Sequence, residues 1–198
     1  MDKNDALARK VVKESNKVIK EKLTKEEVDL IIDYSEEMFM FFNPYCSVRQ
    51  DPKEIVKDFE ESYRQFEHIF RLAPKLPKMI LWRGFSEYQG CDERYKIGNR
   101  IFRPSPLSTT YKEDVVFDED FVVPSDECCI LVITIEEGAR GLAIESISTR
   151  PGEGEILLQF GGELIITGRY KGQRRNEDGV RYTYISAEFK VPKAFKLS

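Results

Sequence analysis

The chain has 198 residues, of which 41% are hydrophobic and 33% are charged, and its formal net charge is −4. This length suits one domain, with or without a helical extension, and the composition excludes a disordered chain. The acidic balance argues against nucleic acid as the main partner, because phosphate binding needs a basic surface. No apolar run approaches the roughly 20 residues of a membrane span, so we expect no membrane partner. The charged N-terminus shows no classical signal peptide, while export by a route that reads no such signal stays open.

The inventory of metal-binding side chains is small. The four cysteines contain no Cys-x-x-Cys pair, and His68 is the single histidine. This inventory is poor for zinc and for a nucleophile activated by histidine, so we expect no metal site. We expect the cysteines to be reduced and mostly structural, in keeping with a cytosolic site of action.

The first part of the chain is expected to be helical, because apolar residues recur there at helical spacing. Three helices are predicted, over residues 5–22, 25–42 and 51–72. The second begins at a capping box, in which Thr24 and Glu27 each bond the backbone amide of the other. Asn43–Pro44 is expected to end it, because a residue that precedes proline disfavours helical geometry.

The pattern then changes to apolar and β-branched runs of strand length. These runs predict strands at residues 78–85, 100–103, 130–136, 142–145, 155–160, 164–170 and 180–189. The remainder of residues 86–110 is expected to be loop. The continuous run ILVITIE at 130–136 indicates a central strand that is buried on both faces. Helices followed by strands predict a single α+β domain over residues 1–198, with a helical part at 1–77 and a mostly β part at 78–198.

Two short segments carry polar side chains that are suited to ligand binding. Arg83 and Gly84, in LWRGF, fall at the end of a predicted apolar strand. The guanidinium could bind phosphate or ribose oxygens, and the glycine would let the backbone come close to a ligand. Ser108 and Thr109, in LSTT, offer hydroxyls that could orient a carboxylate or a ribose. The ordinary alternatives are the polar end of a strand for Arg83, and a strand edge or helix cap for the hydroxyls.

A third segment, PGEGEILL, places two glutamates at the start of an apolar strand. Glu153 and Glu155 are two residues apart, so extended geometry would put both carboxylates on one face. Ile156 and Leu158 would then point to the other face, into a core. Repulsion between like charges makes such a pair costly, and proteins tolerate it mainly where function needs it. The alternative is an exposed acidic turn before the strand.

In this order, the three segments resemble the mono-ADP-ribosyltransferase family of the arginine–serine–glutamate class. Residues 23–43 (LTKEEVDLIIDYSEEMFMFFN) look like the family's helix segment that closes on an asparagine, and residues 141–158 (GLAIESISTRPGEGEILL) look like its Glu-x-Glu segment. LSTT matches the serine-threonine-serine motif, with Thr110 in place of the last serine. The resemblance covers most of the chain. It implies an α+β fold with a split two-sheet core and with NAD, as the substrate, bound in the cleft.

The resemblance also implies roles for single residues. Glu155 would bond the 2′-hydroxyl of the nicotinamide ribose and stabilise the positive charge that develops as the nicotinamide bond breaks. Arg83 would hold the phosphates or ribose of NAD, and the backbone of Gly84 would hold the nicotinamide amide. Ser108 and Thr109 belong to the expected NAD site, where Ser108 would orient Glu155.

Two more residues have implied tasks at this site. Phe117 would stack on the nicotinamide or only pack the neighbouring loop. Glu153 would orient an acceptor guanidinium and take its proton during attack. Because glutamate at this position goes with arginine acceptors in the family, the expected acceptor is an arginine of a target protein. Residues 148–152 would form the loop that meets this target.

The expected activity is therefore transfer of ADP-ribose from NAD to a protein arginine, with release of nicotinamide. The enzyme would be a monomer of toxin-like, host-modifying type, cytoplasmic or delivered into the cytoplasm of a host cell. Two alternatives stay open. One is an NAD glycohydrolase on the same fold, with water as the acceptor, and the other is a non-catalytic interaction module that kept the fold.

Overall fold

The computed structural model describes residues 3–48, 59–86, 91–117, 128–176 and 179–192. Its helices are α1 (Lys3–Lys22), α2 (Lys25–Asp33), the π-helix η1 (Tyr34–Met38), α3 (Phe39–Val48), α4 (Glu60–Leu72), α5 (Cys91–Arg94) and the 3-10 turn η3 (Asp114–Phe117). Its strands are β1 (Met79–Ser86), β2 (Arg100–Arg103), β3 (Leu107–Thr110), β4 (Cys128–Ile135), β5 (Gly141–Ala143), β6 (Glu155–Leu158), β7 (Gly162–Arg175) and β8 (Arg181–Lys190). Most helices precede the strands, which confirms the predicted α+β class.

The strands form one mixed sheet in the order β2-β7-β8-β4-β1-β3-β6-β5. β4 and β8 run parallel, and β4 lies at the centre of the sheet. Its apolar run predicted burial on both faces, and all of its residues except the partly buried Val132 and Thr134 are buried. β1 pairs with β4 along its whole length, but only Trp82 of β1 pairs with β3, opposite Thr110. The sheet is therefore continuous but nearly divided between β1 and β3. The structure therefore has one sheet where the resemblance predicted two, and a single residue pair joins β1 to β3.

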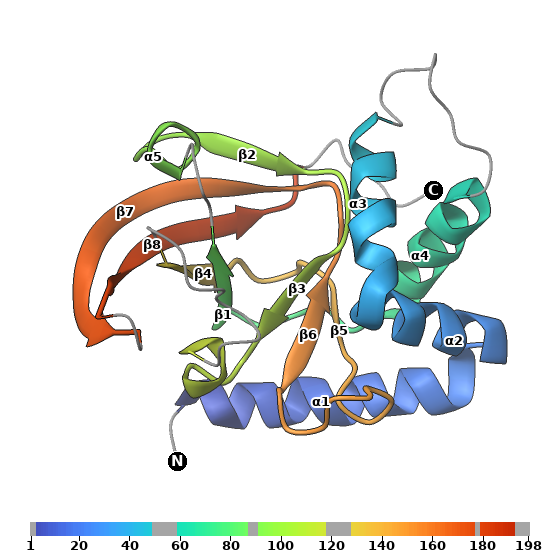
Figure 1. Cartoon of the computed structure of the whole chain (residues 1–198). Helices are drawn as coiled ribbons and strands as arrows, with labels where there is room; N and C mark the ends of the chain where they lie inside the picture. The colour runs from blue at the N-terminus through green and yellow to red at the C-terminus, as the bar shows by residue number, and fades with distance from the viewer. Residues whose placement is uncertain (1–2, 49–58, 87–90, 118–127, 177–178, 193–198) are drawn as a thin grey trace.

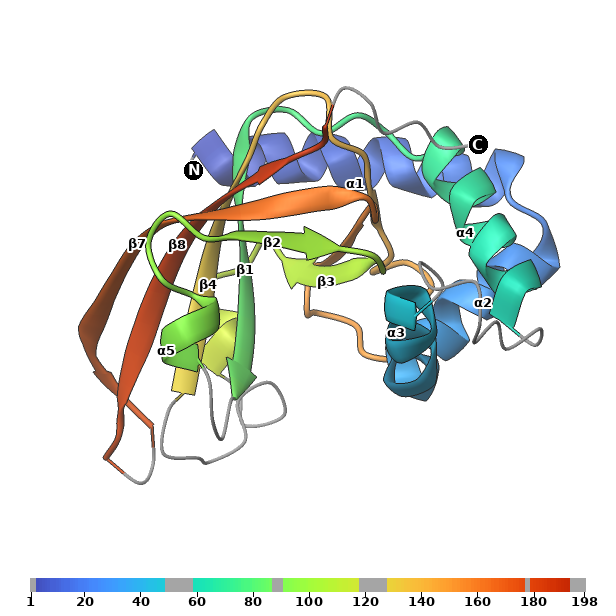
Figure 2. The same ribbon diagram turned by 90° about the horizontal axis from the view of Figure 1, so that it is seen from above.

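Helix α1 crosses one face of the sheet and links two hydrophobic cores (Figures 1 and 2). Its N-terminal half buries Val11 among the strands, and its C-terminal half buries Val18 among the helices. Between them, the hydroxyl of the buried Ser15 accepts a hydrogen bond from the amide of Ala143 in β5, at 3.0 Å. α1 therefore fixes the helical part of the chain against the β part.

Helices α2, α3 and α4 gather at one side of the sheet (Figure 2), and buried aromatic residues pack in their core. Tyr34 meets Phe66 edge-on at 5.2 Å between ring centroids, and Phe42 packs on both. The predicted capping box at the start of α2 is present. The hydroxyl of Thr24 accepts from the amide of Glu27 at 3.2 Å, and the carboxylate of Glu27 accepts from the amide of Thr24 at 2.9 Å. No helix in the described part of the chain is long and apolar enough to cross a membrane.

The predicted end of the second helix at Asn43–Pro44 is wrong. After one π-helical segment at Tyr34–Met38, the helix continues through Pro44 to Val48. Phe42 and Cys46, one turn apart on α3, are both buried in the helical core. Their packing outweighs the local stop signal, as tertiary context commonly overrides local preference.

Residues 86–110 are not all loop. Besides the predicted strand at Arg100–Arg103, the described part of this segment contains the short helix α5 and the strand β3. β3 is short and rich in hydroxyls, and it is a strand because it pairs with β6 along its length. The predicted start of the third helix, near residue 51, lies outside the described residues. Its described portion is α4, which ends at Leu72 as expected.

Candidate active site

A gap opens in the sheet where β1 and β3 part. Trp82 of β1 pairs with Thr110 of β3, and Thr110 pairs with Glu155 of β6, so one row of residues crosses three strands. Beyond this row β1 and β3 no longer pair, and the side chain of Arg83 bridges them. Its Nη1 donates to the carbonyl of Ser108 at 2.7 Å. The sequence motifs therefore meet where β1 and β3 are joined by a single residue pair.

Two adjoining hollows occupy this gap. The smaller has a volume of about 290 Å³, open solvent included, and lies against β1, β3 and η3, with Trp82 and Val116 in its lining. The larger has about 900 Å³, including its opening to solvent, and reaches η1 and α3. The residues that line both hollows are Arg83, Gly84, Ser108, Glu153 and Glu155, so the four predicted catalytic residues lie in one cleft.

Glu155 is the buried acid of this cleft, with 8% of its surface exposed. Burial raises the pKa of its carboxyl to about 7, because the charged form loses its hydration. A hydrogen bond from the Ser108 side chain lowers the pKa, the charge of Glu153 raises it, and the charge of Arg83 lowers it. A carboxyl that titrates near neutral pH in a cleft is typical of functional sites.

Glu153 reaches the cleft by a route that the sequence analysis did not foresee. Gly154, between the two glutamates, has a φ of +63°, so the backbone there is left-handed rather than extended. A Cβ at Gly154 would lie 2.9 Å from the ring of Tyr111. The extended backbone predicted between the two glutamates is therefore absent, but both side chains still line the same cleft. The other part of the prediction is confirmed, because Ile156 is fully buried in the core.

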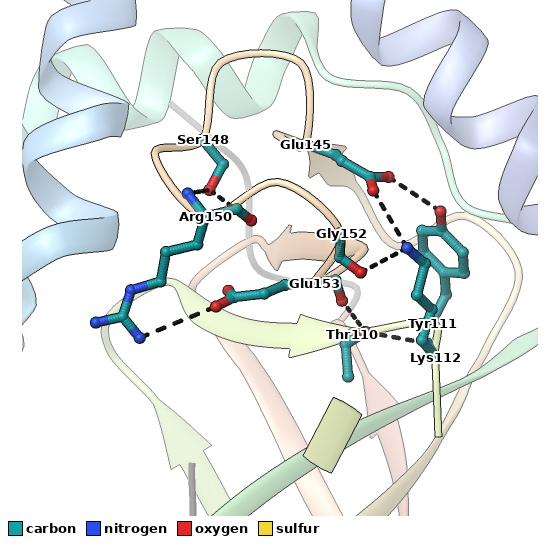
Figure 3. A network of polar contacts seen from close by, with 8 residues as sticks. All are labelled: Thr110, Tyr111, Lys112, Glu145, Ser148, Arg150, Gly152 and Glu153. Carbon is teal, nitrogen blue, oxygen red and sulfur yellow. Dashed lines mark hydrogen bonds and ion pairs between the residues drawn. The ribbon is translucent and has the colours of Figure 1, made fainter. Parts of the chain in front are cut away.

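The end of β3 and the segment that follows it hold the loop that carries Glu153 (Figure 3). Lys112 Nζ donates to the carbonyl of Gly152 at 2.6 Å and to Glu145 at 3.2 Å. The hydroxyl of Thr110 donates to the carbonyl of Glu153 at 2.5 Å. These contacts fix the backbone of the loop, and the Glu153 side chain lines the cleft.

The sequence analysis missed Arg103, which ends β2 and lines the larger hollow. Its Nε is buried and has no hydrogen-bond partner among the described residues. Burial and then the neighbouring charge of Arg83 lower the pKa of Arg103. Two guanidinium groups held together are costly without a compensating anion. The larger hollow is therefore suited to a ligand that carries negative charge.

Helical residues form the outer wall of the larger hollow. They come from η1 and α3: Tyr34, Ser35, Glu36, Phe39 and Asn43. The hydroxyl of Tyr34 lies 2.9 Å from the carbonyl of Pro106 and 3.1 Å from Oδ1 of Asn43, which ties this wall to the segment before β3. π-helical segments are rare in proteins, and those that do occur are often found at functional sites. Residues of η1 and α3 therefore line the larger hollow together with residues of the strands.

Two residues that were expected at the NAD site are placed differently. The hydroxyl of Thr109 donates to the carbonyl of Ile156 at 2.6 Å, so it fastens β3 to β6 even though Thr109 lines the smaller hollow. Phe117 is absent from the described residues that line either hollow, and its ring packs edge-on against Tyr182 at 5.1 Å. Its neighbour Val116 lines the smaller hollow instead. Of the two roles expected for Phe117, this placement corresponds to packing.

No protein-family model matches the sequence, and no curated protein matches it either. Solved structures resemble it over nearly the whole chain. An ADP-ribosyltransferase from Clostridium botulinum is 18% identical with a TM-score of 0.69, and the match covers 94% of this chain and 96% of that one. The ADP-ribosyltransferase Vis from Vibrio splendidus, in complex with agmatine, is 17% identical with a TM-score of 0.66, covering 99% and 90%.

A third similar structure is the ADP-ribosylating toxin BECa of a binary enterotoxin of C. perfringens, with NADH. It is 16% identical with a TM-score of 0.69, and the match covers 96% of this chain but 49% of that one. At these identities the likeness concerns the fold. The chain has the ADP-ribosyltransferase fold that these proteins share, as the sequence resemblance predicted.

Proposed function

We propose that this chain is an ADP-ribosyltransferase that uses NAD as its substrate and an arginine side chain of a target protein as its acceptor. The observation that carries this proposal is the cleft in which Glu155, buried and bonded by Ser108, stands beside Glu153 and Arg83. The fold shared with the ADP-ribosyltransferases described above supports it. In this proposal Glu155 stabilises the cleavage of NAD, Arg83 binds NAD, and Glu153 selects the acceptor.

Each of the two hollows is expected to bind a different part of NAD. Arg83 and Arg103 hold the pyrophosphate in the larger hollow, where two negative charges relieve the repulsion between the two guanidinium groups. The nicotinamide occupies the smaller hollow, against Trp82 and the backbone of Gly84. The presence of NADH in the similar structure of BECa supports a dinucleotide in this cleft.

In the reaction, the bond between the ribose C1″ and the nicotinamide nitrogen breaks, and nicotinamide leaves with the bonding electrons. Positive charge develops on the ribose ring, as in glycoside cleavage. The ionised Glu155 accepts a hydrogen bond from the ribose 2′-hydroxyl and stabilises this charge. Such electrostatic stabilisation is strongest in a buried site, where water does not screen it. Ser108 holds the carboxylate in place.

The acceptor then attacks C1″ from the mouth of the cleft. A guanidinium is a poor nucleophile because it stays protonated. The side chain of Glu153 is 22% exposed, so it can contact an incoming arginine, orient it and take its proton. The complex of the similar enzyme Vis with agmatine, a small guanidine, supports an acceptor of this chemistry.

Labelled NAD and a cell lysate test this proposal. The protein is incubated with both, and modified peptides are mapped by mass spectrometry. We expect label on arginine residues of one or a few proteins. Release of free ADP-ribose with no labelled protein would refute the transferase and leave an NAD glycohydrolase, whereas no NAD turnover at all would leave the non-catalytic module.

The pH dependence of NAD cleavage should follow the ionisation of Glu155. Because the reaction needs the ionised carboxylate and its pKa is raised to about 7, kcat/KM should fall about tenfold per pH unit below 7 and level off above. Ser108→Ala should move the inflection to higher pH, since a bond to the charged form is lost. Glu153→Gln should move it to lower pH, since a like charge is lost. Nicotinamide release measured from pH 5 to 9 checks this, and a flat profile would contradict it.

Substitution of Arg103 should weaken NAD binding. A hydrogen bond to a charged group contributes about 1.5–3 kcal/mol, so Arg103→Gln should raise the Kd for NAD at least tenfold. Trp82, the chain's single tryptophan, lines the cleft and reports binding through its fluorescence. Arg100→Gln is the matched control, because Arg100 lies on the same strand but pairs with Glu163. Equal affinity in both variants would exclude Arg103 from the phosphate site.

A further inference from the structure

An arginine of the chain itself already stands at the expected acceptor position. Nη1 of Arg150 lies 3.9 Å from Oε1 of Glu153, and Arg150 lines the larger hollow. Figure 3 shows its guanidinium turned toward the Glu153 carboxylate. The charge of Arg150 also lowers the pKa of Glu155. With 57% of its side chain exposed, Arg150 has room to move within the cleft mouth.

The loop holds Arg150 in this place. The amide of Arg150 donates to the hydroxyl of Ser148 at 3.1 Å, on one side of the residue. On the other side, Lys112 donates to the carbonyl of Gly152 at 2.6 Å. Because the backbone is anchored on both sides, the guanidinium stays within reach of Glu153.

We propose that Arg150 is an acceptor for the enzyme's own reaction, so that the chain ADP-ribosylates itself within one molecule. This inference rests on the proposed arginine transferase function. An Nη atom of Arg150 forms a bond to C1″ of the ribose as the bond from C1″ to nicotinamide breaks. Nicotinamide leaves with the electron pair of that bond, and the proton of the attacking nitrogen passes to Glu153.

Reaction within one molecule has a kinetic advantage over transfer to a separate protein. A tethered group in the right geometry reacts without an encounter step, and its effective concentration can far exceed that of a free acceptor. Attached ADP-ribose would then occupy the mouth of the cleft. Self-modification should therefore slow later turnovers, and removal of Arg150 should open the position to other guanidines.

The test uses the purified chain with NAD labelled in the adenine part, in one reaction alone and in another with agmatine. We expect label on the peptide that contains Arg150, at a fractional rate independent of enzyme concentration. Arg150→Lys should lose this label and should transfer ADP-ribose to agmatine with a lower KM. Arg181→Lys, at an exposed position of β8 outside both hollows, is the matched control and should keep the label.

The outcomes separate this inference from the function on which it rests. Transfer to agmatine without label at Arg150, or label that persists in Arg150→Lys, would overturn self-modification and leave the transferase standing. Neither label nor transfer to agmatine would overturn the transferase itself. Label on an inactive Glu155→Gln chain mixed with the wild type would show reaction between molecules and overturn the intramolecular step.

Discussion

Glu155→Gln is expected to lower NAD cleavage by a factor of about 10²–10³ or more, with or without an acceptor. The amide keeps the size of the side chain and a hydrogen-bond acceptor, but it removes the fixed negative charge that faces the developing charge on the ribose. Nicotinamide release at pH 8, where the wild-type carboxyl is ionised, measures this directly. Cleavage that survives the substitution would mean that another group carries the chemistry.

The same variant should be more stable than the wild type at high pH. Because the folded-state pKa of Glu155 is about 7, above the ordinary 4.5, the folded chain binds this proton more tightly than the unfolded chain. The resulting stability is present below about pH 4.5 and is lost as the pH rises through about 7. The shift corresponds to a cost on the order of 3 kcal/mol for the buried charge, which glutamine does not carry.

Thermal unfolding at two pH values checks this consequence. Glu155→Gln should raise Tm by several degrees at pH 8 and change it little at pH 5. Glu61→Gln, at an exposed position on α4, is the matched control and should have little effect at either pH. A lower Tm for Glu155→Gln at pH 8 would mean that the buried carboxylate is stabilised by its surroundings rather than strained by them.

Glu153→Gln should separate transfer from hydrolysis. Loss of a positioned general base typically costs about 10²–10⁴-fold, so transfer to an arginine acceptor should fall by at least about 10²-fold. NAD hydrolysis should change only a few-fold at pH 8, because Glu155 and Ser108 are retained. Both products are measured in the same reaction, with and without agmatine, so that hydrolysis reports the integrity of the fold. An equal fall in both would refute the separate role of Glu153.

The elements that the sequence predicted well are those with a persistent local pattern. β4 is a continuous β-branched run, and the capping box at Thr24 needs only residues three apart. The errors arise where distant contacts decide. α3 continues through Pro44 because Phe42 and Cys46 pack into the helical core. β3 is a strand because it pairs with β6.

The candidate site likewise contains residues that a local motif predicts and residues that only the fold brings to the site. Arg83, Ser108 and Glu155 could be found because short motifs carry them in a telling order. Arg103 could not be distinguished from Arg100, since the two occupy one short strand and differ only in which end meets the cleft. The π-helical segment at Tyr34–Met38 was likewise not predicted, because the apolar spacing of residues 25–42 is that of an ordinary α-helix.

The partition of ADP-ribose between water and a guanidine tests the central claim most directly. Labelled NAD is incubated with the wild-type chain over a range of agmatine concentrations, and free ADP-ribose and ADP-ribosylagmatine are quantified. An arginine-directed transferase should form ADP-ribosylagmatine in proportion to agmatine at low concentration, and the product should depend on both Glu155 and Glu153. Nicotinamide release with only free ADP-ribose at every agmatine concentration, or no release at all, would contradict the claim.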